Sequence, residues 1–135
     1  MGNTPKYRDK INLINNRKNT VTILNLHSVT DNISKFNKLT PKLFEDLVIF
    51  VKKNFTLVAF SDLKREIISD KPLMILSFDD GYKDNLSIVA PLMKKLNIPF
   101  TIFITTDYIQ SNDRSYLTPN DIKELSHDFD VDIGS

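Results

Sequence analysis

The feature that most constrains the fold is an apolar segment that ends in two acids and a glycine. Residues 73–78 read Leu-Met-Ile-Leu-Ser-Phe, and Asp79, Asp80 and Gly81 follow directly. A short run that is almost continuously apolar is typical of a strand buried on both faces, as in parallel sheets that helices cover. The sequence therefore predicts an α/β protein that contains this strand.

The rest of the chain alternates between strand and helix patterns. Further strands are predicted at residues 21–26, 55–60, 100–104 and 131–133, and helices at 41–53, 61–68, 86–96 and 118–127. Thr40-Pro41 and Thr118-Pro119 each place a capping threonine before a proline in the first helical turn. Asn97 is expected to end a helix in the left-handed conformation. This order predicts a largely parallel sheet, in a barrel or a doubly wound arrangement.

Composition excludes several other classes of protein. The chain has 135 residues, which suits one domain, and its 18 basic and 17 acidic residues give a net charge of +1, so no nucleic-acid partner is expected. It has no cysteine, which excludes disulfides and thiol nucleophiles. Residues 1–19 are predicted to form a polar arm. Without an apolar leader or spanning segment the chain is expected in the cytoplasm, unless an N-terminal export segment has been removed.

Asp79 and Asp80 follow the strand at the place where parallel α/β folds build their sites. Adjacent carboxylates repel each other, and a metal ion relieves the repulsion. One carboxylate can then bind the metal while the other accepts a proton from metal-bound water, and Gly81 lets the chain turn sharply. The alternative is an Asp-Gly turn without function. The ligand spacing of an EF-hand is absent, and a receiver domain carries its paired acids after the first strand.

Residues 77–82, Ser-Phe-Asp-Asp-Gly-Tyr, resemble the first motif of the polysaccharide deacetylase family (NodB-homology, carbohydrate esterase family 4). Asp84-Asn85 and residues 90–104 resemble the segment that follows this motif in the family, and residues 117–125 and 131–135 resemble the approach to the family's second motif. Leu26-His27-Ser28-Val29 is similar to the first strand of the subgroup that acts on poly-N-acetylglucosamine-type polymers. The resemblance covers residues 20–135, which are expected to form the N-terminal portion of such a domain.

The resemblance implies a partial distorted (β/α) barrel with mostly parallel strands and a hydrolase that removes N-acetyl groups from an amino-sugar polysaccharide or glycan. By position, Asp79 matches the catalytic base and Asp80 matches a metal ligand, with Zn²⁺ or another divalent ion as cofactor. His27, Gly81 and Tyr82 are candidates for contact with the substrate or for support of the site.

The chain also departs from the family pattern. The family's other two metal ligands are histidines four apart, directly after a segment like Ile133-Gly134-Ser135, and neither they nor the catalytic acid are present. The two histidines here are His27 and His127, and His127 is expected to be a surface residue at the C-terminal end of a helix. These 135 residues alone are therefore expected to bind zinc weakly or not at all and to be inactive.

Two expectations follow from this truncated pattern. The first is an alternative to the enzyme: the chain could be a non-catalytic carbohydrate-binding or regulatory half-domain. Uncovered strand edges of an unclosed barrel are expected to drive self-association.

Overall fold

The computed structural model describes residues 20–32, 39–129 and 131–135, so the arm predicted at residues 1–19 lies outside the described part. Its strands are β1 (Val21–Leu26), β2 (Thr56–Leu57), β3 (Leu73–Asp80), β4 (Phe100–Ile104) and β5 (Val131–Gly134). They form one sheet in the order β1-β3-β4-β5, and β2 pairs with β3 beside that path. Every pairing between these strands is parallel. The predicted α/β class with a mostly parallel sheet is confirmed.

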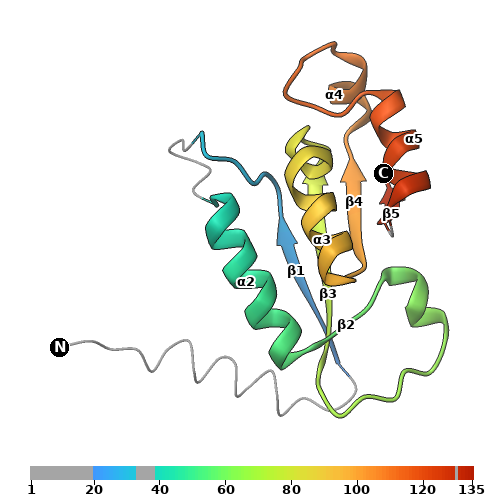
Figure 1. The fold of residues 1–135 in the computed structure, drawn as a ribbon. Coiled ribbons are helices and arrows are strands. Elements are labelled where there is room, and N and C mark those ends of the chain that lie inside the picture. Colours follow the sequence, from blue (N-terminus) through green and yellow to red (C-terminus); the bar gives the residue numbers. More distant parts are fainter. Residues whose placement is uncertain (1–19, 33–38, 130) are drawn as a thin grey trace.

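The α-helices are α2 (Pro41–Asn54), α3 (Ala90–Leu96), α4 (Thr106–Gln110) and α5 (Pro119–Asp128), with a 3₁₀ turn η1 (Phe60–Lys64) and a π-helical turn η2 (Asn85–Val89). Figure 1 shows α2 and α3 beside each other on one side of the sheet, with α4 and α5 near β4 and β5. Among the described residues, no helix combines the length and apolar character needed to cross a bilayer.

The hydrophobic core lies between the helices and one face of the sheet. On β3 the core side chains are Met74, Leu76 and Phe78. The ring of Phe78 makes edge contacts with Phe44 of α2, at 5.8 Å between centroids, and with Phe100 of β4, at 6.0 Å. Because side chains alternate along a strand, the neighbours of these core residues face the opposite side of the sheet.

The helix signals of the sequence are confirmed at the caps. The hydroxyl of Thr40 accepts a hydrogen bond from the backbone N–H of Leu43 at 3.2 Å, and Thr118 accepts one from Asp121 at 3.2 Å. Asn97 closes α3 with φ of 53°. These positions depend on local chemistry, which sequence patterns describe well.

Two of the predicted elements are wrong in extent. The strand predicted at 55–60 is only β2, and the helix predicted at 61–68 is only η1. Asp62 turns back to accept from the N–H of Ala59 at 2.9 Å, which favours a tight turn. Ile68 is 92% exposed, so no burial supports a longer helix there.

The helix predicted at 86–96 is present, but it begins as the π-helical turn η2. The backbone N–H of Ala90 donates to the carbonyl of Asn85, one residue further back than in an α-helix. Pro91 follows, and its ring would clash with the carbonyl four residues before it in a regular helix. The wider turn relieves that clash. Helix α4 was not predicted.

Candidate active site

The backbone turns sharply where β3 ends. Asp80 has φ of 73° and Gly81 has φ of 69°, so two successive residues are left-handed. A Cβ on Gly81 would lie 3.2 Å from the Cγ2 of Ile104 and 3.4 Å from the Cδ1 of Ile109. Glycine is therefore needed here both for its backbone freedom and for its lack of a side chain.

Asp79 is held by a side chain from β1. The Nδ2 of Asn25 donates to the Oδ2 of Asp79 at 2.8 Å. The hydroxyl of Ser77 donates to the Oδ1 of Asn25 at 3.2 Å. Asn25 lies opposite Ser77 in the parallel register, and the sequence analysis did not single it out. One feature of the sequence could have indicated Asn25: it is an amide between two apolar residues, Leu24 and Leu26, in a predicted strand.

Asp80 has a different neighbour. The hydroxyl of Thr105, directly after β4, approaches the Oδ1 of Asp80 at 3.5 Å. Both acids are partly exposed at the C-terminal end of the sheet. The two adjacent carboxylates thus contact different sides of the site, Asp79 toward β1 and Asp80 toward β4, and they can serve different purposes.

A groove of about 1020 Å³ begins at Asn25 and runs over the loops that follow β1 and β3. The predicted site residues His27 and Tyr82 both line it, whereas Asp79 and Asp80 do not. His27 is exposed at the end of β1. The structure therefore brings His27 and Tyr82 to one groove and connects that groove to Asp79 through Asn25.

Asp84 fastens the loop after β1 to the start of η2. Its carboxylate accepts hydrogen bonds from the hydroxyl of Ser28 at 2.5 Å and from the N–H of Val29 at 3.1 Å. The Nδ2 of Asn85 donates to Asp84 at 3.1 Å and to the carbonyl of His27 at 3.0 Å. Burial raises the pKa of Asp84, although these hydrogen bonds act in the opposite direction. The cluster fixes the backbone from which His27 extends.

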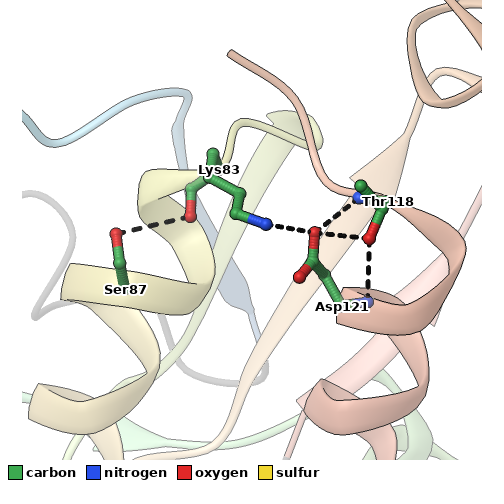
Figure 2. A network of polar contacts seen from close by, with 4 residues as sticks. All are labelled: Lys83, Ser87, Thr118 and Asp121. Carbon is green, nitrogen blue, oxygen red and sulfur yellow. Dashed lines mark hydrogen bonds and ion pairs between the residues drawn. The ribbon is translucent and has the colours of Figure 1, made fainter. Parts of the chain in front are cut away.

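A second polar network ties the groove to α5 (Figure 2). The Nζ of Lys83 pairs with the Oδ2 of Asp121 at 2.5 Å. The same oxygen accepts from the backbone N–H and the hydroxyl of Thr118, at 2.6 Å and 2.8 Å. Burial opposes ionisation of Asp121, but the bonds from Lys83 and Thr118 outweigh it and lower the pKa of that carboxyl. Lys83 is thus tied to a helix cap on one side of the groove.

Three tyrosines stack beside the groove. Tyr116 lies between Tyr82, at 5.0 Å between ring centroids, and Tyr108, at 4.5 Å. One face of Tyr82 is therefore covered by another side chain of this protein. Burial is the main cause that raises the pKa of Tyr116.

The described residues do not form a complete metal site. Within them, no three side chains among histidine, cysteine, aspartate and glutamate gather closely enough to hold a metal ion. His127 lies exposed in the last turn of α5, as the sequence predicts. Asp80 provides one carboxylate, whereas catalytic zinc normally has three protein ligands.

Comparison with known proteins gives a consistent picture of the fold. The family model described as polysaccharide deacetylase matches residues 67–135. The chain is similar to the deacetylase PplD of Streptococcus pyogenes, with a TM-score of 0.70 and 20% identity over 84% of this chain and 54% of that one. For IcaB from Ammonifex degensii the TM-score is 0.73, with 20% identity over 84% of this chain and 51% of that one.

The polysaccharide deacetylase BC0361 from Bacillus cereus matches with a TM-score of 0.71 and 23% identity, over 85% of this chain and 38% of that one. The chain thus spans about half the length of the first two solved structures and less of the third. No curated protein matches it significantly. At these identities the structural likeness shows a shared fold.

Proposed function

Because the chain belongs to the polysaccharide deacetylase family, we propose that it contributes the acid pair of an enzyme that removes N-acetyl groups from an amino-sugar polysaccharide. In this hydrolysis water adds to the amide carbonyl, the carbon–nitrogen bond breaks, and acetate and a free amine are formed. The observation that carries the proposal is the pair Asp79 and Asp80 at the C-terminal end of β3, each beside a different strand.

Asp79 is assigned the role of general base, which accepts the proton of the attacking water. Its orientation by Asn25 supports this role, since a base needs a defined position relative to the water. Asp80 is assigned as one ligand of Zn²⁺ or another divalent cation, and the remaining ligands would come from outside the described residues. Such a cation polarises the amide carbonyl and lowers the pKa of water.

The groove supports a sugar substrate. It is lined by polar groups such as His27, Ser28 and Asp84 together with the ring of Tyr82, a combination suited to hydroxyls and to the apolar face of a sugar. We assign His27 and Tyr82 to substrate contact. The deacetylase PplD was solved in complex with acetate, which is the acid that this hydrolysis releases.

The incomplete metal site favours a second candidate for the 135 residues by themselves, a carbohydrate-binding half-domain without turnover. Measuring zinc in the purified 135-residue chain tests this point. We expect less than stoichiometric zinc and no release of acetate from N-acetylglucosamine oligomers. Tight, stoichiometric zinc would contradict the first expectation, and release of acetate would contradict the second.

The assignment of the two acids is tested in the complete product of the gene that encodes this chain. Asp79→Asn should abolish acetate release and leave the metal content unchanged, because the base does not hold the metal. Asp80→Asn should lower both. Asp70→Asn, in the loop before β3 and exposed, is the matched control and should change neither. Equal metal content in the Asp79 and Asp80 variants would refute the assignment.

A further inference from the structure

Asn25 occupies an unusual position in β1. Its neighbours Leu24 and Leu26 pack against the core, so Asn25 faces the opposite side of the sheet. Ile23 faces the same side of the sheet and is apolar. This face of β1 is therefore not polar throughout, and the amide at position 25 needs its own explanation. In the pairing of β1 with β3, Asn25 lies opposite Ser77, which is two residues before Asp79 in the chain.

The two hydrogen bonds of Asn25 fix the orientation of its amide. Ser77 is buried, and its hydroxyl donates to the Oδ1 of Asn25. The Nδ2 group is thereby directed at the Oδ2 of Asp79, 2.8 Å away. A flipped amide would place its oxygen against the carboxylate, with no donor between the two acceptors. The pair Ser77 and Asp79 therefore selects one amide orientation.

This orientation distinguishes the two oxygens of Asp79. Oδ2 accepts the bond from Asn25. Within the described part of the chain, this is the one side-chain hydrogen bond to Asp79, so Asn25 contacts the carboxylate on one oxygen and not on the other. We propose that Asn25 is a positioning residue that holds Asp79 by its Oδ2 so that Oδ1 faces the attacking water. The inference rests on the proposed role of Asp79 as the base.

The variant Asn25→Leu tests the inference, because leucine has a similar shape and no charge but donates no hydrogen bond. In the complete gene product we expect kcat for acetate release to fall roughly 10- to 100-fold, the loss expected when a reacting group is misplaced by about 1 Å. KM and metal content should stay within about twofold. The matched control is Asn54→Leu, which removes an amide bond to the carbonyl of Phe50 at the other end of the sheet and should leave kcat unchanged.

The outcomes separate this inference from the proposed function. An unchanged kcat in Asn25→Leu overturns the inference, and a raised KM with unchanged kcat shows direct substrate contact instead of positioning. If the complete wild-type gene product released no acetate, the proposed function would be refuted. In that case a crystal structure of the complete gene product decides the point: Asp79 should lose its single carboxylate orientation in Asn25→Leu and keep it in Asn54→Leu. An unchanged Asp79 in both variants refutes the inference.

Discussion

Replacing Gly81 with alanine should destabilise the protein through its backbone. At φ of 69° a residue with a Cβ destabilises the folded state by about 1–2 kcal/mol relative to glycine. The added methyl would also lie 3.2 Å from the Cγ2 of Ile104, closer than the ~3.5–4.0 Å at which carbon atoms attract best. Alanine also lowers the conformational entropy of the unfolded chain, which stabilises the folded state by about 0.4–1 kcal/mol relative to the unfolded one. The strain and the contact together exceed this gain, and we expect a net loss of about 1 kcal/mol.

Equilibrium unfolding in urea measures this loss, with fluorescence and circular dichroism as independent probes. The variant Gly81→Ala should unfold at lower urea with an unchanged slope. In the background Ile104→Leu, which removes the Cγ2 branch, the contact is relieved and only the backbone strain remains. Most of the effect of Gly81→Ala should therefore persist there. An unfolding free energy within about 0.5 kcal/mol of wild type would refute the reasoning, and complete rescue by Ile104→Leu would assign the cost to the contact.

Two further substitutions test the polar clusters. Because the pKa of Asp84 is raised in the folded protein, the folded state binds more protons and loses stability as the pH rises from the ordinary value of 3.8 through the raised pKa. Asp84→Asn cannot ionise, so its unfolding free energy should decline less over that range, and equal declines would contradict the burial of Asp84. Asp121→Ala removes the acceptor for Lys83 and Thr118 and should cost about 1 kcal/mol at pH 7. Since the pKa of Asp121 is lowered, that cost should shrink as the pH falls through the lowered pKa. If the loss of stability in Asp121→Ala did not change with pH, the lowered pKa of Asp121 would be contradicted.

Elements with local signals were predictable from the sequence. The apolar run before Asp79 predicts β3, and threonine-proline pairs predict the starts of α2 and α5. Helix α4 is five residues long, too short for a hydrophobic period to emerge. The segment after β2 carries apolar residues at helical spacing, but Leu63 and Ile68 are exposed. The spacing of apolar residues alone does not reveal whether the fold offers a surface that can bury them.

The candidate site was predictable only in part. Asp79, Asp80 and Gly81 are adjacent in the chain, so one motif reveals them. Asn25 lies 54 positions before Asp79, and only the strand register brings the two together. The predicted self-association stays a prediction. The described sheet does leave β1 and β5 at the ends of its strand order.

The pairing of β1 with β3 has a consequence for the order in which the protein forms during synthesis. The first paired residues, Val21 and Leu73, are 73 − 21 = 52 positions apart. At translation rates of ~5–20 residues per second, β1 waits about 3–10 s for its partner to be made. During that interval its apolar residues are unpaired, and a chaperone that binds extended apolar segments could act on it. Asn25 reaches Asp79 only when β1 pairs with β3, so this one pairing step also orients the proposed base.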